Sequence, residues 1–312
     1  MKTTAPLMAV PRRAMHAGTF YPADPVGLAR LADELLEEVR RGRSTRAGLP
    51  LGLVVPHAGI DWCGPVAAHA WLELEGNPTR AAVGGGAAVG GGAGPSPTVV
   101  LLGTNHFDRG SRGVSIWPGG PWLTPVGAVA VDDELREEIH ALGAPFVARA
   151  EPHLPEHSIE VELPFLRRVR RDARFVPLLV GPLDAGDLRA GGCALGRLLA
   201  GLPSGRPVVL VASSDLAHYP SRAVADEVDD ETLRAMTALD AERLGRHELA
   251  VETAAVHGLA CALCGVEPVS LAITALREMG ASRGRVLAHA TSADAPGGTP
   301  RRVVGYGAVR FD

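Results

Sequence analysis

Short apolar runs alternate along this chain with longer segments of helical periodicity. The apolar runs predict strands near 51–55, 98–103, 113–117, 174–180, 207–213, 285–290 and 302–311. Runs such as TVVLLG and PVVLVA are apolar throughout instead of alternating, which is typical of strands buried on both faces. The pattern therefore predicts an α/β fold with helices on both sides of a sheet.

Helical spacing of apolar residues occurs at 25–41, 64–74, 221–240 and 267–280. Asp24 precedes Pro25 and is placed to cap the first of these helices, since proline is well suited to the first helical turn. Ser221 is placed to cap the third segment, and Gly280 marks the end of the fourth.

One stretch differs from the rest in composition. The sequence AAVGGGAAVGGGAGPSP at 81–97 has too few packing side chains to offset the backbone entropy that ordering costs, so we predict a flexible loop insert over residues 78–97. No linker divides the remainder, and we predict a single domain over residues 1–312.

The composition narrows the class of protein. The chain has 312 residues, of which 46% are apolar, enough for a large core without disulfides. A net charge of −4 gives no reason to expect a nucleic acid or a membrane surface as partner. The N-terminus has no signal-peptide pattern, and no stretch approaches the roughly 20 apolar residues of a membrane span. We expect a cytoplasmic protein.

Polar residues follow three of the predicted strands at the point where each strand ends. His57 follows the first, Asn105 and His106 follow the second, and SSDLAH brings Asp215 and His218 after the fifth. In open α/β sheets, ligands bind beyond the carboxyl ends of the strands. These residues could share one site, in which the small Ala58 and Gly59 leave room for a bound group; each histidine could equally be an isolated, half-buried side chain.

Two further patterns stay open from the residues alone. Cys261 and Cys264 in CALCGVEP could be a redox dithiol, half of a zinc site or two buried helix cysteines, and one thiolate could join the histidines. His157 in EHSIE, with Glu160 three residues later, fits a helix cap as well as a catalytic residue, and His16 fits a packing role.

The motifs together resemble the Memo family, whose bacterial and archaeal members are called AmmeMemoRadiSam system protein B. The segments that carry this resemblance run in order from about residue 12 to 310: HAGTFYP, PHAG, LLGTNH, EHSIEVELPFL, PLLVG, SSDLAHY and CGVEP. The resemblance implies a mixed sheet like that of the class III extradiol (LigB-like) dioxygenases, whose non-haem iron(II) is held by two histidines and a carboxylate.

The same resemblance implies roles for individual residues. In Memo proteins a cysteine replaces the carboxylate, so His57, His106 and Cys264 are the implied metal ligands. Asp215 and His218 are implied to line the pocket as catalytic residues, with His218 where the dioxygenases keep an acid/base histidine. Cys261 departs from the family pattern.

The implied cofactor is iron(II) or copper, and zinc could bind the same site in the purified protein. The implied function is a metal-binding protein with redox or oxygen-dependent chemistry on an unknown small molecule. An extradiol-type dioxygenase is one alternative. A non-enzymatic scaffold working with an AMMECR1-type protein and a radical SAM enzyme is another.

Overall fold

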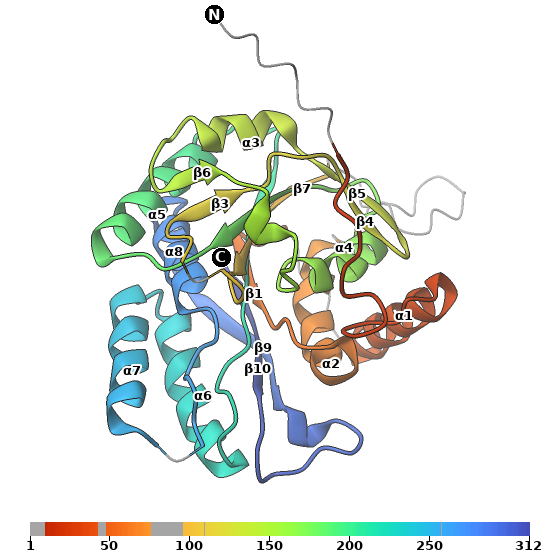
Figure 1. Ribbon diagram of the computed structural model, residues 1–312, viewed down its shortest axis with the longest axis vertical. Coiled ribbons are helices and arrows are strands. Elements are labelled where there is room, and N and C mark those ends of the chain that lie inside the picture. Colours follow the sequence, from red (N-terminus) through yellow and green to blue (C-terminus); the bar gives the residue numbers. More distant parts are fainter. Residues whose placement is uncertain (1–9, 43–47, 76–95, 109, 257) are drawn as a thin grey trace, which may run out of the picture.

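The computed structural model describes residues 10–42, 48–75, 96–108, 110–256 and 258–312. Within these ranges all strands belong to one ten-stranded mixed sheet (Figure 1). The strands are β1 (Gly52–Val55), β2 (Thr98–Thr104), β3 (Val114–Ile116), β4 (Trp122–Thr124), β5 (Gly127–Val131), β6 (Phe146–Ala148), β7 (Arg174–Val180), β8 (Val208–Ser213), β9 (Gly284–Thr291) and β10 (Gly305–Phe311).

The centre of the sheet is parallel and runs in the order β7-β2-β8-β1, with β10 and then β9 added antiparallel at one side. The register places Val55 opposite Ser213 and Leu102 opposite Ala212. Because the three strands β1, β8 and β2 are parallel and in register, their carboxyl ends meet at the same edge.

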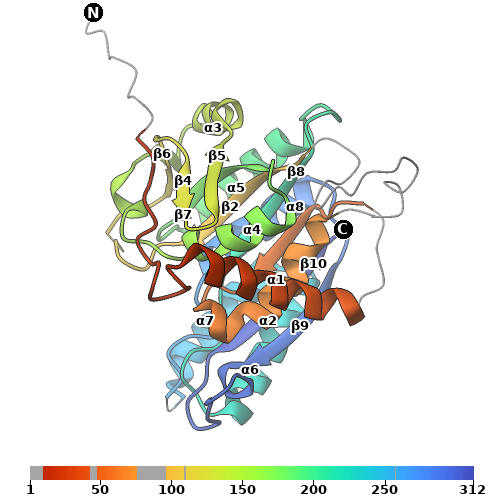
Figure 2. The same cartoon turned by 90° about the vertical axis from the view of Figure 1, so that its right-hand side faces the viewer.

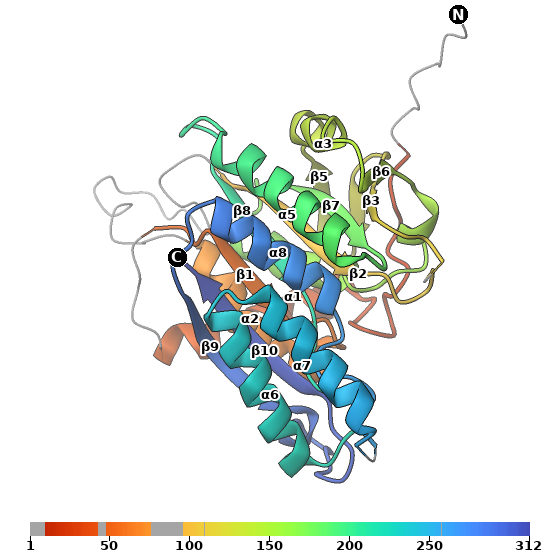
Figure 3. The ribbon, with the colours of Figure 1, turned by 90° about the vertical axis from the view of Figure 1, so that its left-hand side faces the viewer.

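Helices cover both faces of this sheet. They are α1 (Pro25–Gly42), α2 (Ile60–Trp71), α3 (Asp133–His140), α4 (Leu163–Val169), α5 (Ala185–Ala200), α6 (Arg222–Thr237), α7 (Ala241–Ala254) and α8 (Val266–Glu278). Figure 2 shows α1, α2 and α4 over one face, and Figure 3 shows α5 to α8 over the other.

The two helical layers explain the continuous apolar strands. Leu53 and Val55 belong to the core on the α1, α2 and α4 side, whereas Val54, between them, belongs to the core under α5 and α8. Neighbouring side chains of a strand point to opposite faces. Every position of β1 is therefore buried, and the predicted α/β fold with helices on both sides is confirmed.

The predicted elements are found with small shifts at their ends. All seven predicted strands are present, whereas β4, β5 and β6 were not predicted. The helix predicted at 64–74 begins earlier, at Ile60, and its last turn, Leu72–Leu74, is a 3₁₀-helix.

The predicted helix ends are mostly confirmed. The Asp24 carboxylate accepts a hydrogen bond from the Gly27 amide at 2.6 Å, and Gly280, just beyond α8, has a φ of +93°. That left-handed conformation is the reason for glycine there. Ser221 occupies the N-cap position of α6, but its side chain makes no capping hydrogen bond.

Residues 76–95 lie outside the described residues, so the predicted loop insert at 78–97 falls almost wholly outside them. The assignment of residues 1–312 to a single domain stays a prediction. Within the described ranges, no helix is long and apolar enough to cross a membrane.

Glycines allow α5 to lie directly against α8. A Cβ at Gly192 would lie 2.6 Å from Thr274 Cβ, and a Cβ at Gly196 would lie 2.3 Å from the Ala275 carbonyl oxygen. Since real Cβ contacts are never this short, any side chain at these positions would push the helices apart. By contrast, a Cβ at Gly245 in α7 would meet no atom within 4 Å.

We expect Gly196→Ala to lower the free energy of unfolding by about 1–3 kcal/mol, because a methyl group there is overpacked against backbone. Gly245→Ala is the matched control and should raise it by about 0.5–1 kcal/mol, since alanine restricts the unfolded chain. Urea denaturation of both variants measures these changes. Equal effects at the two positions would contradict the close packing of α5 on α8.

Candidate metal centre

Three loops bring imidazole and thiol groups together at the carboxyl edge of the sheet. His57 follows β1, His106 follows β2, and Cys264 lies just before α8. The ligand atoms of these three residues all lie within 4.8 Å of one another. Of the two interpretations left open by the sequence, a shared site and isolated histidines, the geometry favours the shared site.

His57 is held from both its backbone and its ring. Its amide donates to Asp215 Oδ1 at 2.8 Å, and its Nδ1 lies 3.0 Å from Ser213 Oγ. Its Nε2 is buried and has no hydrogen-bond partner among the described residues. Burial lowers the pKa of His57 to about 4, so the ring is neutral at pH 7, the form that a metal ion binds.

Gly59 has a different role from the one expected. It is the N-cap residue of α2, and its carbonyl accepts from the Trp62 and Cys63 amides. A Cβ on Gly59 would meet the Phe20 carbonyl oxygen at 3.4 Å and Trp62 Cδ1 at 3.5 Å, not the three ligand atoms. Its small size therefore serves the packing of the loop against Phe20.

The carboxylate of Glu156 orients His106. Glu156 Oε1 lies 2.9 Å from His106 Nδ1, and Oε2 accepts the His106 amide at 2.7 Å. His106 Nε2 is thereby turned toward Cys264, with Sγ at 3.1 Å. A carboxylate behind the distal nitrogen is the usual support of a metal-binding histidine.

Glu156 stays ionised although it is buried. Burial by itself raises its pKa, but the hydrogen bond and charge of His106, the charge of His157 and the Ser158 amide together lower it to about 2.

The glycine that follows Cys264 is required by close packing of this loop. A Cβ at Gly265 would lie 2.5 Å from Thr104 Oγ1, so only glycine allows this loop to approach the end of β2. The Gly265 amide donates to Ser214 Oγ at 2.8 Å, and the Cys264 amide donates to the Asp215 carbonyl at 3.1 Å. Cys264 thus sits at the N-terminus of α8, where the helix dipole favours a thiolate.

Neither cysteine of the CxxC lies in a helix, so their interpretation as two buried helix cysteines is wrong. Cys261 pairs through its backbone with His218, and both thiols are partly exposed. Cys264 belongs to a possible ligand group within the described residues, whereas Cys261 does not.

His106, Glu156 and His157 form a second group that could hold a metal ion. In that group, however, Glu156 already accepts from the amides of His106, His157 and Ser158 as well as from the His106 ring. Oε1 therefore already accepts three hydrogen bonds and Oε2 one. The group of His57, His106 and Cys264, with its orphaned Nε2, is the better metal site.

Asp215 and His218 lie next to this group. Asp215 Oδ1 accepts from the His57 and Ala58 amides, which places it under the turn that carries His57. His218 Nε2 lies 3.7 Å from Asp215 Oδ2, and His218 is near enough to influence the pKa of His57. Asp215 thus contacts backbone amides rather than a ligand imidazole.

Two residues of one motif surround the cluster; Glu156 was not predicted, and His157 was considered only as a helix cap or a catalytic residue. Glu156 and His157 belong to the EHSIE motif, and the His157 ring stacks on that of His106 at 4.6 Å between centroids. No α-helix starts at His157, and a short 3₁₀-helix begins only at Glu160, so the capping interpretation is wrong. The EHSIE motif itself could have indicated these two residues. It holds two carboxylates and an imidazole within five residues, whereas a helix cap needs only one polar side chain.

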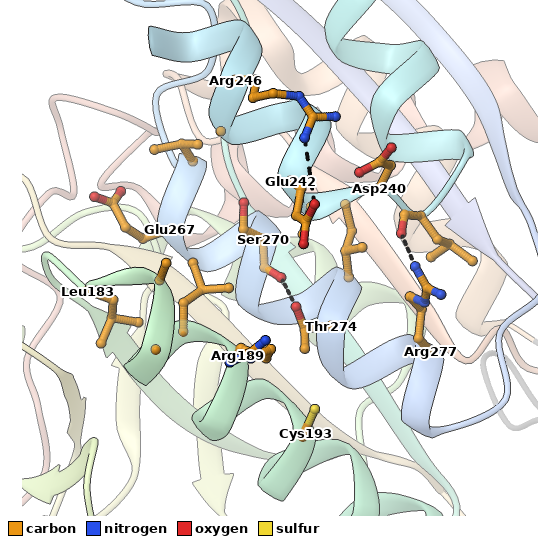
Figure 4. Close-up of a pocket in the computed structure, with 18 of the residues that line it drawn as sticks. Leu183, Arg189, Cys193, Asp240, Glu242, Arg246, Glu267, Ser270, Thr274 and Arg277 are labelled. Atoms are coloured by element: carbon orange, nitrogen blue, oxygen red, sulfur yellow. Dashed lines mark hydrogen bonds and ion pairs between the residues drawn. The ribbon is translucent and has the colours of Figure 1, made fainter.

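A groove of about 980 Å³ lies elsewhere, between α5, α7 and α8 (Figure 4). Its lining includes Arg189 and Cys193 of α5 and Thr274 of α8, but none of the candidate ligands. Several of its polar groups satisfy one another, as in the ion pair of Glu242 with Arg246. The groove is therefore separate from the candidate metal centre.

Comparison with known proteins identifies the family of this chain. A family model described as Memo-like protein matches residues 12–310. A MEMO1 family protein of Methanopyrus kandleri is 36% identical over 305 residues, 95% of this chain and 96% of the relative. One from Sulfolobus acidocaldarius is 35% identical over 311 residues, 95% and 97% of the two chains. The chain belongs to the Memo-like family.

One solved structure shows a weaker likeness. The crystal structure of an uncharacterized protein from Escherichia coli K12 is 15% identical and aligns with 83% of this chain and 99% of its own, at a TM-score of 0.43. A likeness of this strength supports no conclusion about the fold or the site.

Neutral buried histidines make the metal-free protein sensitive to acid. Burial lowers the pKa of His153 to about 3, of His157 to about 3 and of His57 to about 4. Below pH 6.5 these three histidines become protonated in the unfolded chain but stay neutral in the folded protein. Each of these histidines should therefore lower the free energy of unfolding by about 1.4 kcal/mol for every pH unit that the pH falls between 6.5 and its own folded pKa.

His153 tests this apart from the metal cluster, because its Nε2 bonds to the Ser115 carbonyl and its ring packs on Trp117 and Trp122. We expect His153→Phe to reduce the slope of the unfolding free energy between pH 6.5 and 5 by about 1.4 kcal/mol per unit. Urea denaturation measures it, with His140→Gln on α3 as control. An unchanged slope in His153→Phe would contradict the assignment.

Proposed function

We propose that this protein is a Memo-family metal-binding protein whose centre is formed by His57, His106 and Cys264, and that it carries out redox or oxygen-dependent chemistry on a small molecule. The observation that supports this most strongly is the buried Nε2 of His57. It has no hydrogen-bond partner among the described residues, and His57, His106 and Cys264 each offer one ligand atom within 4.8 Å of the others. An unpaired buried nitrogen is costly unless something binds it.

The donor set indicates which metal fits. Two neutral imidazoles and a thiolate on one side of an ion are softer than the two histidines and carboxylate of non-haem iron sites. Iron(II) and copper are the proposed cofactors, with zinc as a competitor. A bound iron or copper ion would supply redox chemistry at its remaining open coordination positions.

The protein's own groups prepare these ligands. Glu156 fixes His106 from behind, and the amide of Cys264 is tied to the Asp215 carbonyl. The N-terminus of α8 favours the thiolate of Cys264. The ligands are thus arranged before a metal arrives, which reduces the entropy that binding has to overcome.

His218 is the proposed acid/base group. Its Nε2 is buried and has no hydrogen-bond partner among the described residues, and it lies 3.7 Å from the Asp215 carboxylate. A proton on Nε2 would be stabilised by that carboxylate, so His218 can accept a proton near the centre and release it again. Asp215 acts in this scheme as a positioning residue.

We expect His57→Ala, His106→Ala and Cys264→Ser each to reduce bound metal at least tenfold while the protein stays folded, because each removes one of three ligands. Cys261→Ser, three residues away, is the matched control and should keep its metal. The protein is purified without oxygen and offered iron(II), copper(I) and zinc in competition, and metal content is measured by mass spectrometry. Loss of metal in Cys261→Ser but not in Cys264→Ser would refute the ligand assignment.

We expect His218→Ala to keep most of its metal but to react differently with oxygen or peroxide, because it removes a proton acceptor and not a ligand. Stopped-flow spectroscopy of the metal-loaded protein measures the rate. His140→Ala is the control. An unchanged rate in His218→Ala would exclude the acid/base role.

The same purified protein can distinguish the two alternative functions. Cleavage of a catechol by the iron form would favour the extradiol-type dioxygenase, against which the softer Cys264 counts. A wild-type protein that binds none of the three metals would favour a scaffold role with an AMMECR1-type protein and a radical SAM enzyme. Co-purification with those two proteins tests that role directly.

A further inference from the structure

Three groups converge on the hydroxyl of Ser213 at the end of β8. Ser213 Oγ lies 2.6 Å from the Ser158 carbonyl oxygen, 3.0 Å from His57 Nδ1 and 3.1 Å from Glu162 Oε1. Ser213, Glu162 and His57 are all at most 1% exposed. These groups are removed from bulk solvent, and buried polar groups are generally hydrogen-bonded, so we take the protein groups to satisfy one another.

The direction of each hydrogen bond follows from counting hydrogens. A serine hydroxyl has one hydrogen to donate and two lone pairs to accept with. The Ser158 carbonyl oxygen can only accept, and it is the nearest of the three neighbours, so it receives the Ser213 hydrogen. The other two neighbours, His57 Nδ1 and Glu162 Oε1, must then both donate to Ser213 Oγ.

Glu162 can donate only as an uncharged carboxylic acid, and its surroundings favour that form. Burial, with a smaller contribution from the charge of Asp215, raises the pKa of Glu162 to about 8, although the hydrogen bond from Trp71 lowers it. Its other oxygen, Oε2, accepts from Trp71 Nε1 at 2.8 Å. With the proton on Oε1, every polar atom of this carboxyl group has a partner.

We propose that Ser213 is a positioning residue that fixes His57 in the tautomer protonated on Nδ1, with the Ser158 carbonyl setting the direction and Glu162 completing the network as an uncharged acid. The lone pair of His57 is thereby placed on Nε2, the buried atom that has no hydrogen-bond partner among the described residues. The consequence for metal binding rests on the proposed function, whereas the tautomer itself does not.

The tautomer can be read directly in the metal-free protein. Long-range ¹H–¹⁵N correlation spectra distinguish the two neutral forms of each histidine ring, and His57→Ala identifies the signals of His57. We expect the wild-type protein at pH 7 to show His57 protonated on Nδ1. A His57 ring protonated on Nε2 would overturn the proposal.

Substitutions of Ser213 separate positioning from simple packing. Ser213→Ala removes the acceptor of the Nδ1 hydrogen, so His57 should become a mixture of tautomers and bind iron(II) about 10–100-fold more weakly. Ser213→Thr keeps the hydroxyl and should restore the Nδ1 tautomer. Ser115→Ala, a buried serine on β3 outside this network, is the matched control. An unchanged His57 spectrum in Ser213→Ala would overturn the proposal.

Glu162→Gln tests the uncharged acid. The glutamine amide can donate to Ser213 and accept from Trp71 as the acid does, so tautomer and iron(II) affinity should stay within about twofold of wild type. Infrared difference spectra should show a carboxylic-acid band that is lost in Glu162→Gln, and its absence from the wild type would refute this part. If wild-type protein bound no metal, the proposed function would fail, while the spectra would still decide the tautomer.

Discussion

The residue Asp215 joins two of the loops that form the candidate metal centre. Its carboxylate accepts the amides of His57 and Ala58, and its carbonyl oxygen accepts the amide of Cys264. A buried carboxylate is tolerated only where hydrogen bonds replace its water shell. The turn after β1 and the loop before α8 are therefore both held at the end of β8, and the distance between His57 and Cys264 follows from this one residue.

Buried carboxyl groups around the cluster differ in charge because their partners differ. Glu156 is surrounded by amides and the His106 ring, which outweigh burial and lower its pKa to about 2. Among the described residues, the hydrogen-bond partners of the Glu162 carboxyl group are the Trp71 indole and the Ser213 hydroxyl, so burial dominates and raises its pKa to about 8. Glu156 is thus ionised and orients the His106 ring, while Glu162 is uncharged and donates to Ser213.

The N-terminal segment is part of the same assembly. Arg12 is buried, forms an ion pair with Glu160, and donates to the carbonyl oxygens of His153 and Glu156. Glu160 also accepts the amide of His16 and the hydroxyl of Tyr21. The HAGTFYP and EHSIE motifs, far apart in the chain, therefore form one structural unit behind the histidine cluster.

The sequence by itself determined seven of the ten described strands, the two-sided cover of helices and the three strand ends that carry His57, His106 and Asp215, because apolar periodicity is a local property. Only the tertiary structure decided that Glu156 supports His106, 50 residues earlier, and that His157 stacks on the same ring. It also brings the Cys264 thiol to the histidines, as the family resemblance implied. These contacts depend on loops that meet after the sheet has formed, and residue spacing along the chain does not encode such meetings.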